Sequence, residues 1–181
     1  GKNFSGIKES DVAAFRRDHL GFVFQEFNLL DTFTLEDNIY LPLVLAGMGY
    51  EEMRERLKPI ARELGLTELL KKYPYEVSGG QKQRAAVARA IITQPKLLLA
   101  DEPTGALDSH TGREVLGMLQ DLHGQGHTVV LITHDNSIAV QADRIIRLED
   151  GRVVYDGDSH APEAMVQPTL LPETPEKEEQ A

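Results

Sequence analysis

The chain has 181 residues, 41% of them hydrophobic, and no cysteine, which suits one well-buried domain and excludes disulfides and thiolate metal sites. Its formal charge of −10 disfavours a nucleic-acid-binding protein, because neutralising phosphates needs clustered Lys and Arg. No apolar run approaches the ~20 residues that cross a bilayer, and the first residues lack the apolar segment of a signal peptide. We therefore expect a cytosolic protein that meets a membrane only through a partner.

Helical and strand patterns alternate along the chain, which is typical of an α/β domain with a largely parallel sheet. Residues 9–19 (ESDVAAFRRDH) are predicted to form a short helix. Residues 20–24 (LGFVF) follow as a strand that delivers Gln25 at its end.

Two further helices are predicted after this strand. Thr34 and Asp37 have the spacing of a capping box that opens a helix through about Leu45. Residues 51–65 (EEMRERLKPIARELG) have a helical pattern that Pro59 interrupts, so we expect a kink or two shorter helices. The apolar residues on one face of this pattern are Met53, Leu57, Ile60, Ala61 and Leu64.

The rest of the pattern predicts one helix, two strands and a hairpin. The helix covers about residues 79–93. Residues 97–100 (LLLA) and 128–133 (TVVLIT) are short apolar runs, as expected of strands that are buried on both faces. Residues 144–149 (RIIRLE) and 152–157 (RVVYDG) flank an Asp-Gly pair, which predicts a β-hairpin.

The composition changes over residues 158–181. This stretch is rich in Pro and Glu and has few apolar residues to bury, so we predict a disordered acidic tail. A solvated terminus without a role is the preferred interpretation over a docking motif. The folded part is then expected to end near residue 157.

The stretch VSGGQKQRAAVARA, residues 77–90, places a serine and two glycines at the start of an alanine-rich helix. Ser78 is suited to accept hydrogen bonds from the first helical amides, and Gly79 and Gly80 let a ligand approach the backbone. Free amides and the helix dipole favour an anion there. The pattern predicts a phosphate seat, which needs further residues to bind and cleave a nucleotide.

The stretch KLLLADEPTGALD, residues 96–108, places two adjacent acids, Asp101 and Glu102, at the carboxyl end of a strand. Open α/β sheets bind ligands at this edge. One acid is suited to hold a hydrated Mg²⁺ beside substrate phosphates, and the other to orient or deprotonate a water. The alternative is an ordinary polar strand end, which Pro103 terminates.

Four other polar residues stand at the ends of predicted elements. His134 could donate to a phosphate oxygen or to Glu102, although a lone histidine is more often structural. Gln25 could ligate Mg²⁺ or hold a water, or be a plain surface residue. Asp108 and Asp135 are suited to cap the helices that follow them, a role that does not exclude function.

Five short motifs, taken in order, resemble those of the nucleotide-binding domain of ABC transporters. FVFQ resembles the Q-loop, VSGGQ the signature motif, LLLADEP the Walker B motif, ALD the D-loop and ITHD the switch loop. Their site residues are Gln25; Ser78, Gly79, Gly80 and Gln81; Asp101 and Glu102; Asp108; and His134. Residues 15–47 are most similar to the subgroup that serves lipoprotein release, macrolide export and resistance to peptide antibiotics.

The resemblance implies an ATPase with the parallel sheet of P-loop NTPases and a helical subdomain at about residues 34–93. It implies ATP and Mg²⁺ as cofactors, with Asp101 and Gln25 in the magnesium shell. Glu102 would activate or position the hydrolytic water, and His134 would sense the γ-phosphate.

The resemblance also implies two protein partners. Residues 78–81 would press on the γ-phosphate of nucleotide held by a second ATP-binding subunit, and Asp108 would lie at the interface of this dimer. Residues 27–45 would face a transmembrane permease subunit on the inner side of the cell membrane. The expected contact residues are Phe27, Leu29, Leu30 and Phe33, with burial in their own domain as the alternative.

One motif of the family is not found. No G-x-x-x-x-G-K-[ST] loop precedes the Q-loop, since Gly1-Lys2 continues with Asn3, and the family's first strands are missing too. The resemblance therefore predicts a partial domain over residues 1–157, truncated at its N-terminus. By itself it would bind ATP weakly, hydrolyse it hardly at all and fold with marginal stability.

Two other functions compete with a transporter ATPase. Chromosome-maintenance and DNA-repair ATPases share the signature, but they carry long coiled coils and this chain has no sustained heptads. A non-hydrolysing module that docks on a permease, or pairs with an intact ATPase subunit, stays open. The transported substrate and the direction of transport are not encoded in these motifs.

Overall fold

The computed structural model describes residues 6–164, and the chain divides into two compact units, Gly1–Ile132 and Thr133–Ala181. The first unit contains α1 (Glu9–His19), β1 (Leu20–Phe24), α2 (Leu35–Leu45), α3 (Tyr50–Glu63), the short 3₁₀ helices Thr67–Leu69 and Pro74–Glu76, α4 (Gly79–Ile91), β2 (Leu97–Asp101), α5 (Ser109–Gly124) and β3 (Thr128–Ile132). The second contains α6 (Asn136–Ala139), β4 (Arg144–Glu149), β5 (Arg152–Asp158) and a 3₁₀ turn, Pro162–Ala164.

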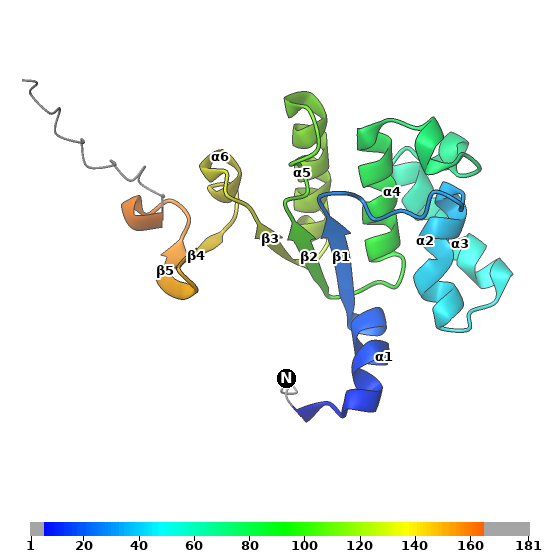
Figure 1. Ribbon diagram of the computed structural model, residues 1–181, viewed down its shortest axis with the longest axis horizontal. Coiled ribbons are helices and arrows are strands. Elements are labelled where there is room, and N and C mark those ends of the chain that lie inside the picture. The colour runs from blue at the N-terminus through cyan, green and yellow to red at the C-terminus, as the bar shows by residue number, and fades with distance from the viewer. Residues whose placement is uncertain (1–5, 165–181) are drawn as a thin grey trace, which may run out of the picture. The chain divides into compact units, whose positions relative to one another are not determined.

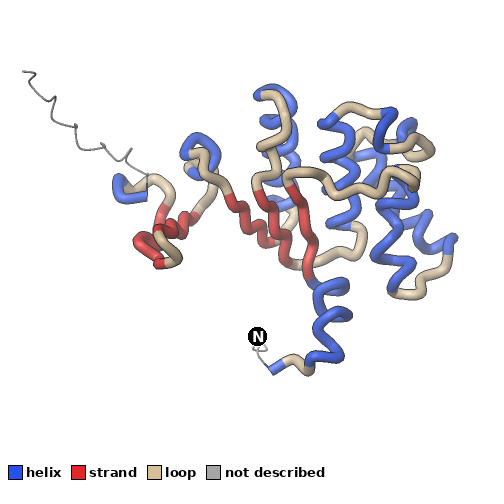
Figure 2. The backbone as a smooth tube through the Cα atoms, in the orientation of Figure 1, coloured by secondary structure: helices blue, strands red, loops and turns tan. Residues whose placement is uncertain are grey.

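The first unit is built on a parallel sheet with strand order β1-β2-β3, which confirms the predicted α/β class (Figures 1 and 2). The register pairs Phe24 with Asp101 and Asp101 with Ile132, so the three strands end level with one another. Figure 1 shows α2, α3 and α4 gathered beside β1, and no strand lies between residues 34 and 93. The carboxyl edge of the sheet is therefore the natural place for a ligand.

One face of this sheet carries the core. Val23, Leu98 and Ala100 point to this face and are buried, and α4 packs on β1 while α5 packs on β3. The buried face of α4 consists largely of alanines, and this small side chain lets the helix lie close to the sheet and to α5. The apolar residues of α2 and α3 continue the same core.

The opposite face of the sheet is partly open, so the prediction that residues 128–133 are buried on both faces is wrong. Burial alternates along β3, with Val130 and Ile132 exposed to 45% and 57%. Side chains alternate across a strand, and α4 and α5 pack against the face that carries Val23. The rings of Phe22 and Phe24 stack on one another on the open face.

The helices begin where the sequence predicts and differ from it at one proline. Thr34 and Asp37 form the expected capping box at the start of α2. Pro59 lies inside α3, which is one helix, so the alternative of two shorter helices is wrong. Pro59 is on the exposed side, and the buried residues Met53 and Leu57 hold the helix through its other face.

The second unit is the predicted hairpin with short flanking turns. β4 and β5 pair antiparallel, and Asp150 and Gly151 between them have φ of 47° and 74°, which confirms an Asp-Gly turn of the type expected. Arg144 and Asp156 form a two-point ion pair across the strands. These contacts join the two strands in a two-stranded sheet.

Part of the predicted tail lies within the described residues. Ser159 and Ala164 are buried after the end of β5, so order continues for some residues past the boundary drawn at Asp158. Residues 165–181 lie outside the described residues, and disorder there stays a prediction. Within residues 6–164, no helix combines the length and apolar character needed to cross a membrane.

Candidate functional site

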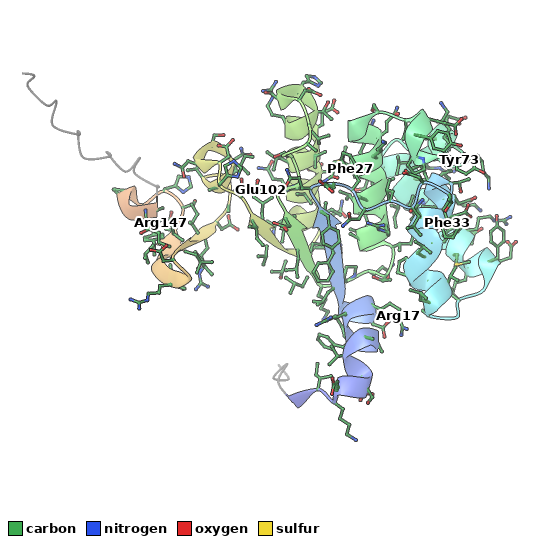
Figure 3. The ribbon with its side chains drawn as sticks, viewed as in Figure 1. Arg17, Phe27, Phe33, Tyr73, Glu102 and Arg147 are labelled. Atoms are coloured by element: carbon green, nitrogen blue, oxygen red, sulfur yellow. The ribbon has the colours of Figure 1, made fainter. Side chains whose placement is uncertain are left out.

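The carboxyl edge of the three-stranded sheet brings three predicted site residues together. Gln25 and Glu102 each follow one of two paired residues, Phe24 and Asp101, so they leave the sheet side by side. The amide of Glu102 donates to the carbonyl of Ile132 on β3, at 3.0 Å. Figure 3 shows Glu102 at the end of β2 and Phe27 in the loop that follows β1.

The backbone is strained at this edge. Phe27, Asn28 and Glu102 have φ of 63°, 48° and 44°, a left-handed conformation that disfavours residues with a side chain. They are three of the five non-glycine residues with positive φ among residues 6–164. Such strain costs of order 1 kcal/mol a residue and persists where surrounding contacts impose it, often at functional sites.

The side chain of Gln25 lies against the turn that follows Glu102. A Cβ added to Gly105 would stand 2.8 Å from Nε2 of Gln25, so the end of this flexible side chain would have to move aside. The amide of Gly105 in turn donates to the carbonyl of Glu102 at 3.0 Å, closing the turn. Gln25, Asp101 and Glu102 therefore form one polar cluster, which we call the sheet-edge cluster.

The sheet-edge cluster has few protein ligands for a cation. Within residues 6–164, no group of three His, Cys, Asp or Glu side chains is placed to hold a metal ion by itself. A carboxylate and an amide oxygen match what Mg²⁺ accepts when phosphates and waters complete its shell. The residues present thus fit Mg²⁺ that arrives with a phosphate ligand, rather than a resident metal.

The predicted phosphate seat is the N-terminus of α4. Ser78 caps the helix, since its Oγ accepts from the amide of Gln81 at 3.3 Å. The Gln81 side chain returns the bond by accepting from the amide of Ser78 at 2.9 Å. This capping box has the form S-x-x-Q, and it confirms that Ser78 accepts a hydrogen bond from the first turn of the helix.

Asp108 joins the start of α4 through Thr111. Its carboxylate caps α5, accepting from the amides of His110 and Thr111, each at 3.0 Å, and from the Thr111 hydroxyl at 2.6 Å. Several hydrogen bonds lower the pKa of Asp108 to about 2, and the one from the Thr111 hydroxyl has the largest effect. A Cβ added to Gly80 would stand 2.3 Å from Cγ2 of Thr111, so α4 and α5 start in close contact.

The last predicted site residue is His134. It follows β3 by two residues and belongs to the second unit, and its place beside the γ-phosphate stays a prediction. Its neighbour Asp135 caps α6 as expected, with Oδ1 accepting from the amide of Ser137 at 2.8 Å.

The expected contact residues for a membrane partner divide into two groups. Phe27 and Leu29 are half-buried, and Leu29 packs against the core. Leu30 and Phe33 are exposed to 47% and 39%. The buried amide of Asn38 holds this loop, accepting from the amide of Leu30 at 2.7 Å and donating to the carbonyls of Leu30 and Phe33.

Sequence reasoning missed three polar residues that hold the loops of the site. They are Asn38 on α2 and, on α4, Gln83 and Arg89. Gln83 is fully buried, and both α4 side chains bond to main-chain carbonyls far away in sequence. A polar residue on the buried face of an alanine-rich helix is the signal that could have found Gln83.

The family model for the ABC transporter matches residues 3–105, more than half of the chain. The chain belongs to the ABC transporter family. The match includes Gln25, residues 78–81, Asp101 and Glu102, which lie in the motifs on which the resemblance rested. The chain is thus an ABC transporter ATP-binding domain, and the predicted family is confirmed.

Two curated relatives are similar over most of this ABC domain. It is 42% identical to the macrolide export ATP-binding/permease protein MacB 1 of Yersinia pestis over 175 residues, 97% of this chain and 27% of MacB 1. It is 47% identical to the bacitracin export ATP-binding protein BceA of Halalkalibacterium halodurans over 162 residues, 87% of this chain and 64% of BceA. The chain therefore spans about a quarter of one relative and less than two thirds of the other.

Two solved structures have the same fold as this ABC domain. The dimeric structure of MJ0796, a bacterial ABC transporter cassette, superposes with a TM-score of 0.75 and 39% identity, covering 87% of this chain and 70% of that one. A dimer of MJ0796 in a post-hydrolysis state, bound to ADP and Pi, superposes with a TM-score of 0.74 and 38% identity, covering 86% of this chain and 69% of that one. The predicted ABC ATPase fold class is confirmed.

Proposed function

We propose that this chain is the catalytic domain of a transporter ATPase, in which Glu102 activates the water that attacks ATP. The observation that supports this most directly is the sheet-edge cluster, where Glu102 is held in a left-handed conformation beside Gln25. A carboxylate at the carboxyl end of a parallel strand faces the ligand edge of such a sheet.

We assign ATP and Mg²⁺ as the ligands of the sheet-edge cluster. Asp101 and Gln25 would supply one carboxylate and one amide oxygen to Mg²⁺, and His134 would contact the γ-phosphate. When bound, Mg²⁺ neutralises charge on the phosphate oxygens. Residues 1–181 contain no G-x-x-x-x-G-K-[ST] sequence, so we propose that turnover needs a phosphate-binding loop in addition to them.

The seat at the start of α4 serves a second ATP-binding subunit in this proposal. Residues 78–81 would face the γ-phosphate held by that partner, with Asp108 at the interface. Support comes from the contact between Gly80 and Thr111, which brings the capped starts of α4 and α5 together on one surface. Both MJ0796 structures are described as dimeric.

The membrane partner would be an export permease bound on its inner face. Leu30 and Phe33 are exposed apolar residues that this partner would cover. Figure 3 shows Phe33 and Tyr73 on the helical part of the first unit, and the stacked rings of Tyr73 and Tyr75 add to its apolar surface. We place the nucleotide-binding domain within residues 1–157 and its helical subdomain at about 34–93, and we place the acidic tail after the 3₁₀ turn that ends at Ala164.

The second candidate function is a module that docks on a permease or an intact ATPase subunit without hydrolysis. The observation that favours it is the sequence itself, which supplies the signature seat and the sheet-edge cluster without a phosphate-binding loop. In that case the intact ATPase subunit would bind the nucleotide, and Glu102 would have no catalytic role.

The test uses the complete cassette, meaning residues 1–181 together with a phosphate-binding loop. Glu102→Gln keeps the shape of the side chain and removes its charge, so turnover should fall by about 10²–10⁴-fold while ATP binding persists. Steady-state ATPase assays and equilibrium ATP binding measure the two. Glu68→Gln, in the exposed turn before α4, is the matched control. Unchanged turnover in Glu102→Gln would remove Glu102 from the catalytic role and favour the docking module.

A further inference from the structure

Two side chains of α4 reach across to the sheet-edge cluster. Gln83 is fully buried, and its Nε2 donates to the carbonyl of Pro103 at 2.8 Å and to that of Phe24 at 3.4 Å. Phe24 immediately precedes Gln25, and Pro103 immediately follows Glu102. One amide group thus joins the main chain next to both side chains that the proposed hydrolysis needs.

The orientation of the Gln83 amide is determined by these carbonyls. Reversing it would place its oxygen against two carbonyl oxygens, which repel it. Its Oε1 has no hydrogen-bond partner within residues 6–164. An unpaired buried oxygen costs stability, and this orientation accepts that cost because both N–H groups then donate to carbonyls. A buried, half-satisfied amide is a weak choice for stability alone, which points to a role in geometry.

Arg89 makes the second connection. Its Nη2 donates to the carbonyl of Phe27 at 2.9 Å and its Nη1 to that of Asn28 at 2.6 Å. These two residues are the left-handed ones in the loop after Gln25. Burial lowers the pKa of Arg89, so its guanidinium gives up solvation to make these bonds. The strained loop is therefore held by a half-buried cation from another element.

Gln83 and Arg89 lie on the same helix as the capped seat at Ser78. An α-helix of 13 residues is stiff on this length, so a displacement of its N-terminus moves both side chains. The side chain of Gln25 is exposed and lies against the turn at Gly105. The seat and the sheet-edge cluster are thus parts of one connected body.

We propose that Gln83 and Arg89 are positioning residues, which fix the Gln25 loop and the turn after Glu102 relative to the phosphate seat of α4. The inference rests on the proposed function, since it concerns the geometry of the same ATPase site. Neither side chain touches the reacting atoms. Contact of the seat with a phosphate is transmitted through Gln83 and Arg89 to the groups that hold Mg²⁺ and water.

The test is a double-mutant cycle in the complete cassette, with the Mg²⁺ concentration for half-maximal ATPase as the readout. Arg89→Met and Gln25→Ala should each raise this concentration about tenfold, and the double variant should raise it no further. Arg89→Lys should recover part of the loss, because its ammonium still donates to the carbonyls. Arg84→Met, on the same helix with its guanidinium near Gly65, is the matched control.

A second measurement is independent of activity. Hydrogen exchange at the amides of Phe27 and Asn28 should become faster in Arg89→Met and in Gln83→Met, but not in Arg84→Met. Unchanged exchange, or effects of Arg89→Met and Gln25→Ala on the Mg²⁺ dependence that simply add, would overturn the positioning role. A wild-type cassette without Mg²⁺-dependent ATPase would overturn the proposed function instead, and exchange would still decide the role of Arg89.

Discussion

The sheet-edge cluster and the capped start of α4 are built in opposite ways. At the sheet edge, Glu102 and the loop after Gln25 have left-handed backbone held in place by side chains from α4. At the start of α4, Ser78 has ordinary extended dihedrals, φ −69° and ψ 163°, and its amide and hydroxyl are paired with Gln81. One region is strained and held from outside, and the other is relaxed and satisfied locally.

The difference indicates which region depends on the rest of the fold. A capping box forms from four consecutive residues, so the proposed seat for an anion needs little more than α4 itself. The sheet-edge cluster needs the strand register, the turn at Gly105 and the cation of Arg89 together. The geometry at the start of α4 therefore depends on neighbouring residues, whereas the geometry of the sheet-edge cluster depends on the packing of the whole domain.

The largest expected effect breaks the close fit between the starts of α4 and α5. In Gly80→Ala the new methyl group would meet Cγ2 of Thr111, which must move, so we expect a loss of ~1–3 kcal/mol in urea unfolding. The double variant Gly80→Ala with Thr111→Ser removes that methyl carbon and keeps the hydroxyl, so it should regain most of the loss. A double variant as unstable as Gly80→Ala would show that the contact is not the cause.

A smaller loss is expected when the local cap is removed. Ser78→Ala deletes the oxygen that accepts from the amide of Gln81, which should lower the free energy of unfolding by ~1 kcal/mol. Ser78→Asp keeps an acceptor and should restore stability, as measured by thermal and urea unfolding. If Ser78→Ala left the free energy of unfolding unchanged, packing rather than the cap would fix the N-terminus of α4. The contrast with the sheet edge would then weaken.

The sheet edge should respond in the opposite direction. Glycine adopts a left-handed backbone without steric cost, so Glu102→Gly should increase the free energy of unfolding by roughly 0.5–1 kcal/mol, while it abolishes the proposed catalysis. Asp101→Gly is the control: it lies in β2, where glycine destabilises. Both variants are compared by urea unfolding. Destabilisation by Glu102→Gly would mean that contacts of its side chain outweigh the strain of its backbone.

The smallest effect concerns pH and Asp108. Its folded pKa, about 2, lies below the ordinary aspartate value of 3.8, so the unfolded state binds the proton more tightly. The stability that Asp108 contributes is complete above pH 3.8 and is lost as pH falls through about 2. In Thr111→Val, which lacks the hydroxyl donor, stability should fall less between pH 5 and pH 3. If the free energy of unfolding fell equally with pH in wild type and in Thr111→Val, the Thr111 hydroxyl would not be the cause of the low pKa.

The same contrast explains what the sequence could predict. Helix starts at Thr34, Ser78, Asp108 and Asp135 depend on neighbouring residues, and each carries its cap as expected. The strand ends that carry Gln25, Asp101 and Glu102 follow from apolar runs and the rule for parallel sheets. These features were readable because the interactions that make them span only a few residues.

The features that the sequence could not give depend on long-range contacts. The bonds from Gln83 and Arg89 join residues 20 to 62 positions apart, and no spacing rule connects them. The open face of β3 and the continuous helix through Pro59 are set by which sides of these elements meet the core. The positive φ of Glu102 is likewise imposed by its surroundings, since its residue type disfavours it.

The buried amide of Asn38 has a mechanical consequence for the exposed residues beside it. It binds the main chain at Leu30, Phe33 and Thr34, so a loop that carries apolar side chains outward is fastened to the first turns of α2. A force applied to Phe33 from outside is therefore borne by a helix instead of being absorbed by slack backbone.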